Sequence, residues 1–452
     1  MADNTTIALH TEGDTIATDD LTTLNGAAVS TVKVQRTKVG YGDDADLRDV
    51  STQFPLPVQF SSAQLSPFND LIAIALTPLV QMDFVYGINT QQGAAAIVTT
   101  GVGDTSNGRL RLQTGIGAAG SASYTSRRPA QYRPGQGMIW RGTALFTAGA
   151  ASSFQLAGAG SPTNGYFFGF NGTAFGIAHR NDSATPTWVA QTAWNGDKCD
   201  GTGASAFNWD KTKGVPLQIT IPYLGFGNIA FSVQNPLTGR WILCHTIRYA
   251  NSSAATQVRI PDLFVRYEAT NTGNTTNLIL YAGSSVIFLC GEASLLGKPK
   301  WAADSVKTAV TTETVLLSIR NATTYNGVVN SGLIRLNSVS LGSTANNGVA
   351  ILRIKLGATV GGSPSFTTIN GTTSDNGVTI TAGNSLASLD TAGTTVTGGT
   401  YLFNLVIGSP GNETLNVQDL SIFVPPGETL TISGFSTAST TLCAGVNWTE
   451  DN

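Results

Sequence analysis

The feature that most constrains the fold is an alternation of apolar and polar residues that recurs between Gly165 and Glu268. In the segments 217–221 and 229–233, every second residue is apolar and the residues between them are small or polar. Such alternation buries one face of a sheet and leaves the other in water. The sequence NPLTG at 235–239 supplies hairpin chemistry, because proline presets one dihedral angle and glycine tolerates a positive φ. The pattern predicts a meander of half-buried strands, one sheet of a β-sandwich.

Composition extends this prediction to the whole chain. Charged residues make up only 12% of the sequence and glycine contributes 51 positions, which suits pleated sheets joined by tight turns better than helix bundles. We expect an all-β protein with three parts. These are an N-terminal arm (1–62), a large jelly-roll or lectin-like sandwich (63–296) and a smaller immunoglobulin-like or TNF-like sandwich of about seven strands (297–452). The sequence GKPKW at 297–301 is the expected linker.

The stretch from 63 to 90 leaves its structure open. Its apolar run is compatible with a short helix after Ser66-Pro67, with a buried strand pair, or with a seam between three subunits. Pro78 interrupts the run LIAIALTPLV at 71–80, which is also too short to span a membrane.

The first 62 residues carry a concentration of aspartates and too few apolar residues for a core of their own. One strand is expected at Ser30–Val39, and the sequence FPLPV at 54–58 is held extended by its two prolines. We expect an arm that completes its fold by adding a strand to a neighbouring protein. The residues predicted to bind that partner are Val32, Val34, Arg36, Val39, Phe54 and Leu56. The competing interpretation is an acidic tail with no docking role.

Two sets of motifs resemble known proteins. The succession GYFFGFNGTAFGI, WNGDKCDGTGASAFNWDKTK, LQITIPYLGFGNIAFSV and IPDLFVRYEATNTGNTTNL, about a quarter of the chain, resembles a module of virion structural proteins of tailed bacteriophages. The order GDTIATDD, VKVQRTKVGYG and FPLPV resembles an N-terminal cassette of phage virion proteins. The resemblance implies a place on a virus particle, attachment through the arm, and cyclic self-association such as a homotrimer.

Charge and targeting signals exclude several classes. A formal net charge of −3 does not suit a nucleic-acid binder, and the densest basic group, Arg127, Arg128 and Arg133, is interpreted as a solvated loop. The N-terminus has no signal peptide, so we expect synthesis in a host cytoplasm, incorporation into a virion and no membrane insertion.

The cysteines give no metal or disulfide signature. The chain has 4 cysteines and no CxxC pair, which suggests neither a zinc ribbon nor a disulfide framework. Cys244 and Cys290 stand in apolar strands and are expected to be packed thiols.

Catalytic signatures are weak. His179 and His245 are distant in sequence and no GxSxG elbow accompanies them, so a nucleophilic triad is disfavoured. Asp197 and Asp200, with Asp210 further on, form the most concentrated acidic group of the central module. These aspartates are compatible with an acid pair for glycoside cleavage, with a calcium loop, or with turn residues that cap strand ends. The sequence favours the turn residues. We therefore expect no enzyme and no cofactor, with calcium as the weaker alternative.

Three tryptophans in or beside loops, Trp188, Trp194 and Trp209, suggest either a platform for a sugar ring or ordinary packing. The main hypothesis is a non-enzymatic tail or neck appendage of a phage particle that self-associates and binds other virion proteins. The alternatives are a capsid decoration or head fibre, and a receptor- or glycan-binding tail module that contacts a host surface glycan.

Overall fold

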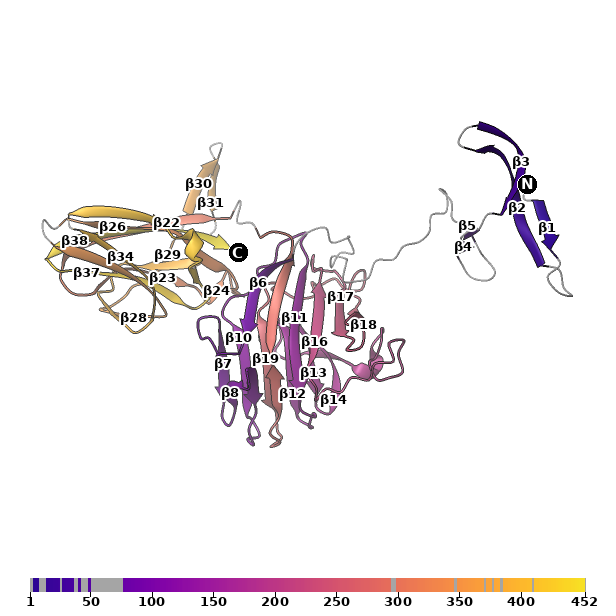
Figure 1. Cartoon of the computed structure of the whole chain (residues 1–452). Coiled ribbons are helices and arrows are strands. Elements are labelled where there is room, and N and C mark those ends of the chain that lie inside the picture. The colour runs from indigo at the N-terminus through magenta and orange to yellow at the C-terminus, as the bar shows by residue number, and fades with distance from the viewer. Residues whose placement is uncertain are drawn as a thin grey trace. The chain divides into compact units, whose positions relative to one another are not determined.

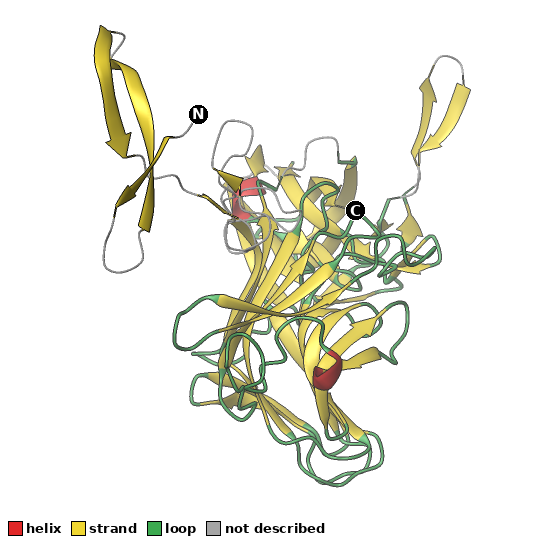
Figure 2. Cartoon of the chain, turned by 90° about the vertical axis from the view of Figure 1, so that its right-hand side faces the viewer, coloured by secondary structure: helices red, strands yellow, loops and turns green. Residues whose placement is uncertain are grey.

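The computed structural model describes residues 3–7, 14–24, 27–35, 40–41, 48–49, 76–293, 298–344, 348–369, 371–375, 378–382, 385–408 and 410–451. The chain divides into two compact units, Met1–Ser61 and Ser62–Asn452. Strands dominate both units, and the described residues contain only two short 3-10 helices, η2 (Gln191–Ala193) and η3 (Gln418–Leu420) (Figure 2). No helix among the described residues is long and apolar enough to cross a membrane. The predicted all-β class is confirmed.

The described residues of the first unit form five paired strands, where the sequence predicted one. β1 (Asp3–Ile7) and β3 (Ala27–Gln35) flank β2 (Asp14–Leu24) in an antiparallel sheet, and β4 (Gly40–Tyr41) pairs with β5 (Arg48–Asp49). The single-strand expectation was wrong, because the threonine, isoleucine and leucine residues of β2 favour a strand despite its aspartates. The dipeptide Asn25-Gly26, a strong hairpin signal, was overlooked.

The predicted partner-binding residues fall only partly within this sheet. Val32 and Val34 belong to β3, which pairs along one edge with β2. Arg36, Val39, Phe54 and Leu56 lie outside the described residues.

The second unit begins with a large sandwich of two antiparallel sheets. The seven-stranded sheet has the order β15 (Thr187–Ala190), β14 (Ala174–Arg180), β13 (Gly165–Asn171), β12 (Ser153–Gly160), β19 (Val265–Asn271), β10 (Ser121–Ser126), β7 (Gly93–Val98). The nine-stranded sheet has the order β18 (Trp241–Ile247), β17 (Ile229–Gln234), β16 (Val215–Ile221), β11 (Met138–Phe146), β20 (Ile279–Ala282), β9 (Arg109–Gln113), β8 (Val102–Ser106). β21 (Ser284–Cys290) pairs with both β11 and β6 (Leu76–Asp83).

Figure 1 shows the strands of this sandwich side by side. The core between the sheets follows from the alternation of buried and less buried residues along these strands. Along β11, Met138, Trp140 and Ala144 are fully or almost fully buried, and they contribute to one core cluster that extends from Val80 to Leu289. Residues 76–83 of the ambiguous stretch form the edge strand β6, and the expected helix or seam at 63–75 lies outside the described residues.

A second sandwich follows, with its own core cluster between Val310 and Trp448. One sheet has the order β22 (Lys300–Val310), β38 (Thr440–Asp451), β26 (Leu333–Ser343), β35 (Gly411–Asn416), with β36 (Phe423–Val424) also on β26. The other has the order β29 (Thr367–Thr368), β32 (Ala387–Asp390), β23 (Thr314–Asn321), β37 (Thr429–Ser436), β27 (Val349–Leu356), β34 (Thr400–Gly408). Short ladders join β24 (Thr324–Tyr325) to β25 (Val328–Val329), β28 (Thr359–Gly361) to β33 (Thr395–Thr397), and β30 (Gly371–Asp375) to β31 (Val378–Ala382).

Two expectations about this sandwich are corrected. The predicted linker enters β22 at Lys300, and the carbonyl of Pro299 accepts the Glu450 N–H at 2.9 Å, so this stretch packs against β38. Alternation in the sequence places Leu352 and Ile354 in the core and predicts that Lys355 faces water, but Lys355 is only 3% exposed. Its ammonium reaches Glu313 at 2.8 Å, and that ion pair explains how the charge is accommodated.

Polar contacts connect the two sandwiches. The two terminal nitrogens of Arg133 donate to the two carboxylate oxygens of Asp451 at 2.5 and 2.6 Å. The Ser331 hydroxyl donates to the Asp262 carboxylate at 2.6 Å. Burial raises the pKa of Asp262. Because Arg133 pairs with a residue far away in the sequence, its interpretation as part of a solvated basic loop was wrong.

Candidate ligand groove

A groove of about 590 Å³ lies on the nine-stranded sheet. Trp140 and Ala144 of β11 point into the core, so Arg141 and Thr143 between them point to the opposite face of the sheet. Register places Arg141 between Gln218 of β16 and Val286 of β21. The lining comprises Gln81, Met82, Asp83, Gln92, Arg141, Gly142, Thr143, Pro216, Trp241, Ser284, Ser285 and Val286.

Arg141 is held in the groove by packing and by one hydrogen bond. Its guanidinium carbon lies 5.5 Å from the ring centre of Trp241 and 5.6 Å from that of Phe288, and its Nε donates to the Gln218 side-chain oxygen at 2.8 Å. Burial lowers the pKa of Arg141, which nonetheless stays charged at neutral pH. Within the described residues the two terminal nitrogens of Arg141 have no protein acceptor, so they remain available to a ligand.

The β17–β18 hairpin places Trp241 in the groove. The predicted turn is present: Asn235 accepts the Gly239 N–H at 2.8 Å, and Gly239 has a φ of +69°. Trp241 follows directly as the first residue of β18, opposite Gln234, and is half-buried. The Arg141 guanidinium lies over the ring of Trp241, and the indole lines the groove.

The polar residues around these two side chains complete the site. Gln81 and Asp83 on β6 and Ser284 on β21 are exposed and line the groove with amide, carboxylate and hydroxyl groups. A flat aromatic surface beside fixed donors and acceptors matches a sugar ring, whose apolar face stacks while its hydroxyls form hydrogen bonds.

The three tryptophans predicted as a platform do not form one. Trp194 and Trp209 are only 4% and 3% exposed and belong to the core of the first sandwich. Both meet the ring of Phe175 edge-on, at 6.3 and 4.8 Å. Trp188 is half-buried on the other sheet, packed against a small cluster that includes Phe167. The loop around these tryptophans folds back over the sandwich edge, which sequence position alone did not reveal.

Asp197 and Asp200 stabilise turns through hydrogen bonds to nearby residues. Asp197 accepts the backbone N–H groups of Cys199 and Ser205, both at 2.8 Å, while Asp200 accepts from the backbone and hydroxyl of Thr202. The Thr202 hydrogen bonds lower the pKa of Asp200. Burial raises the pKa of Asp197, but the hydrogen bonds that Ser205 and Cys199 donate to its carboxylate outweigh burial and lower the pKa. A general acid for glycoside cleavage requires a raised pKa, and the described residues contain no cluster of metal-ligating side chains.

The two distant histidines meet in a pocket of about 260 Å³. His179 lies on β14, and its Nε2–H donates to the Gln257 carbonyl at 2.6 Å. His245 accepts the Asn195 N–H through Nδ1 at 3.2 Å. Burial lowers the pKa of both imidazoles. No carboxylate lines this pocket, so the residues that a Ser/His/Asp triad requires are not brought together there.

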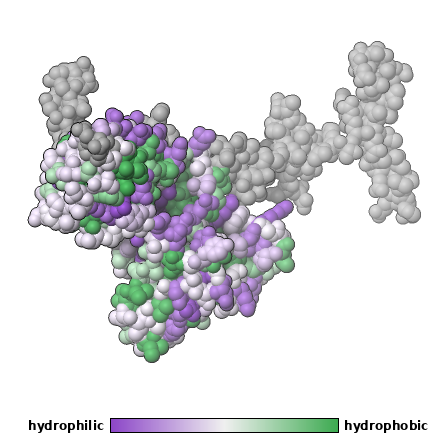
Figure 3. Space-filling model, turned by 60° about the vertical axis from the view of Figure 1, so that its left-hand side comes forward, coloured by the Kyte–Doolittle hydropathy of each residue, from purple (hydrophilic) through white to green (hydrophobic). Residues whose placement is uncertain are grey.

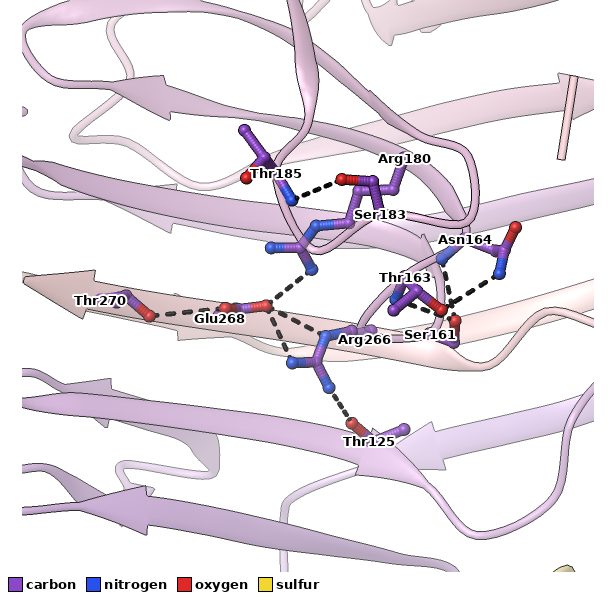
Figure 4. Close-up of polar contacts among 10 residues, drawn as sticks. All are labelled: Thr125, Ser161, Thr163, Asn164, Arg180, Ser183, Thr185, Arg266, Glu268 and Thr270. Carbon is purple, nitrogen blue, oxygen red and sulfur yellow. Dashed lines mark hydrogen bonds and ion pairs between the residues drawn. The ribbon is translucent and has the colours of Figure 1, made fainter. Parts of the chain in front are cut away.

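A buried charge network lies on the seven-stranded sheet (Figure 4). Glu268 accepts from Arg180 at 3.0 Å and from Arg266 at 2.9 Å, and Arg266 also donates to Thr125 at 2.6 Å. Burial alone raises the pKa of Glu268, but the charges of Arg266 and Arg180 outweigh it and hold the pKa below its usual range. With every one of these side chains almost enclosed, the network holds strands together and is not an open site.

Comparison with known proteins gives only structural likenesses. No protein-family model and no curated protein matches the chain. The chain is similar to the carbohydrate recognition domain of Emp47p, with 10% identity, a TM-score of 0.30, and coverage of 47% of this chain and 96% of that domain. It is similar to a legume lectin-like domain from Entamoeba histolytica, with 13% identity, a TM-score of 0.28, and coverage of 46% and 95%. A glycoside hydrolase family protein from Mycobacterium thermorestibile gives 12% identity, a TM-score of 0.32, and coverage of 46% and 100%. At these TM-scores and identities the likenesses carry no argument about ligand or activity.

Proposed function

We propose that this chain is a glycan-binding module that acts through the groove on the nine-stranded sheet. The observation that carries the proposal is the pair Trp241 and Arg141, in which a half-buried indole lies beside a guanidinium whose two terminal nitrogens have no acceptor among the described residues. This moves the glycan-binding hypothesis from the loop tryptophans to a site that sequence analysis did not select.

The arrangement favours sugars over a purely apolar ligand. Arg141 is held between two rings and bonded to Gln218, so it loses little freedom when a ligand hydroxyl or carboxylate binds its outer nitrogens. Asp83 and Gln81 supply acceptors and donors from β6, which β21 separates from β11 in the same sheet. Such preorganised polar groups around an aromatic surface select ring position and hydroxyl orientation.

A glycan array with the full-length chain tests the proposal. Trp241→Ala is expected to abolish binding to any glycan that the wild-type chain retains. The matched control is Trp188→Ala, which removes a half-buried tryptophan from the opposite sheet and should leave binding unchanged. Equal loss in both variants, or no binding by the wild-type chain with and without calcium, would contradict it.

We further propose that the module is a structural part of a tailed-phage particle, attached through the first unit. The support is the resemblance of the N-terminal motifs and the separation of Met1–Ser61 from the rest of the chain as a unit. The chain lacking residues 1–62 is expected to keep glycan binding and to lose binding to particles stripped of the native protein. Retained particle binding would refute attachment through this unit.

We propose self-association through β7. This strand ends the order of its sheet and has the uncharged sequence GAAAIV, without the lysines or prolines that normally protect an edge. Ile97 pairs with the core residue Ala122 yet is 59% exposed, and Val98 is 52% exposed. Figure 3 shows apolar surface at this end of the first sandwich. A second copy whose own β7 edge pairs there meets no like charge, and such a pairing of two identical edges closes a dimer. Mass photometry distinguishes this dimer from a monomer and from the homotrimer that the resemblance implies.

A further inference from the structure

Two cysteines that are distant in sequence lie side by side in the first sandwich. Cys199 stands in the segment between η2 and β16, and Cys244 lies in β18. Both side chains are fully buried in the core cluster. Their Sγ atoms are 3.5 Å apart, within hydrogen-bond distance for thiols.

The backbone on both sides of this pair is fixed. The N–H groups of Gly196 and Asp197 donate to the carbonyls of Cys244 and Leu243, each at 2.9 Å, so the segment runs alongside β18 as an additional short pairing. The Asp197 carboxylate also accepts the Cys199 N–H. The two sulfurs therefore meet because of main-chain pairing and not through a chance side-chain rotamer.

Cys199 itself has an uncommon backbone conformation. Its φ is +51°, in the left-handed region that non-glycine residues seldom adopt. Its carbonyl accepts the Trp209 N–H at 2.9 Å, which together with the Asp197 contact fixes this conformation. This is the geometry at which the Cys199 side chain turns toward Cys244.

We propose that Cys199 and Cys244 are a covalent modification site that forms a reversible disulfide. An S–S bond of about 2.05 Å requires the sulfurs to approach by roughly 1.5 Å, which small side-chain rotations supply. With oxidised glutathione as the oxidant, one thiol attacks it, releases one reduced glutathione and forms a mixed disulfide. The second thiol displaces the other glutathione. The two protein thiols thus lose two protons and two electrons, which reduce oxidised glutathione to two molecules of reduced glutathione.

The disulfide would bind the 195–214 segment covalently to the edge of the nine-stranded sheet. That edge strand, β18, also carries Trp241 at its first position. Because the cross-link restricts the unfolded chain between the two cysteines, the oxidised form is more resistant to denaturation than the reduced form. The inference concerns the framework of the module and stands whether or not the groove binds glycans.

Access sets the rate of the reaction. The hydrogen bond with Cys199 and burial raise the pKa of the Cys244 thiol well above its ordinary value, so little thiolate exists in the folded reduced chain. Oxidation of the folded protein is therefore slow, whereas folding in an oxidising buffer removes this barrier.

The experiment is to unfold the full chain under reducing conditions and refold it in buffers of defined ratios of oxidised to reduced glutathione. Intact mass and a peptide map are then recorded after alkylation. The expected result is loss of two hydrogen masses, one peptide linking Cys199 to Cys244, and two alkylated thiols at Cys290 and Cys443. Four alkylated thiols in a refolded chain, or a link that involves Cys290 or Cys443, would overturn the proposal.

A stability measurement distinguishes the bond from packing alone. The wild-type chain and the Cys290→Ser variant should both unfold at higher denaturant in the oxidised than in the reduced form. Cys199→Ser should show one midpoint under both conditions. Should that variant fail to fold, Cys244→Ala fills the same role, because it removes the partner thiol and keeps the segment unchanged. Equal midpoints for oxidised and reduced wild-type chain would also overturn the proposal.

Discussion

Replacing two tryptophans one at a time distinguishes packing from ligand contact. Trp194 is 4% exposed and meets Phe168 and Phe175 edge-on at 6.4 and 6.3 Å, so Trp194→Ala leaves a large cavity in the core. Such changes cost about 3–5 kcal/mol. The indole N–H of Trp194 is buried without a hydrogen-bond partner in the described structure. Removing this N–H relieves a desolvation cost of about 1–3 kcal/mol. We therefore expect Trp194→Ala to lower the free energy of unfolding by an amount at the lower end of the range for large core truncations, about 3 kcal/mol.

Trp241→Ala should be far milder. Trp241 is half-buried, and its main described contact is the cation–π interaction with Arg141, worth about 0.5–1 kcal/mol. For a domain the size of the first sandwich, 1 kcal/mol shifts Tm by about 2–4 °C, so we expect a fall of about 6–12 °C for Trp194→Ala and of about 4 °C or less for Trp241→Ala.

Differential scanning calorimetry of the full chain measures both shifts against the wild type. The reasoning is refuted if Trp194→Ala leaves Tm unchanged, or if Trp241→Ala lowers it as much as Trp194→Ala does.

Three further outcomes are expected. Glu268→Gln leaves two buried arginine charges without their carboxylate and should cost about 3–5 kcal/mol of unfolding free energy in urea titrations; a loss below 1 kcal/mol would show the network to be dispensable. Burial lowers the pKa of His179 and His245 below 6.5, so the unfolded chain binds more protons below that pH. The free energy of unfolding should then be constant from about one pH unit above 6.5 upward and decrease as the pH falls through 6.5, and a double His→Gln variant should lose that decrease. Ile97→Lys places a charge on the open edge at β7 and should lower the apparent oligomer mass in mass photometry without lowering Tm.

Alternation predicted the sheets but not what lies on their faces. The turn at 235–239 and the strands on either side were predicted from the sequence, because proline, glycine and period-two patterning act locally. The burial of Trp194 and Trp209 was not, because it depends on a loop that returns to the sandwich edge. The same loop brings Cys199 to Cys244, a contact that no spacing rule anticipates.

The groove was missed for a related reason. Trp241 and Arg141 lie in separate strands that are far apart in the sequence. Their proximity requires the order β18-β17-β16-β11, which local sequence does not specify. A tryptophan that directly follows a hairpin turn on the polar side of its strand was the one available signal. Lys355 is an error in the other direction, a residue that alternation places in solvent but that the structure buries. Its burial depends on the ion pair with Glu313, which comes from the loop before β23.

The measurement that tests the glycan-binding account most directly is hydrogen–deuterium exchange of the full chain with and without the best glycan from the array. The account predicts slower exchange in β11, β18 and β21, the strands that carry Arg141, Trp241 and Ser284, and no change in the 195–214 segment. Protection confined to that segment or to the second sandwich, with the groove strands unchanged, would contradict it.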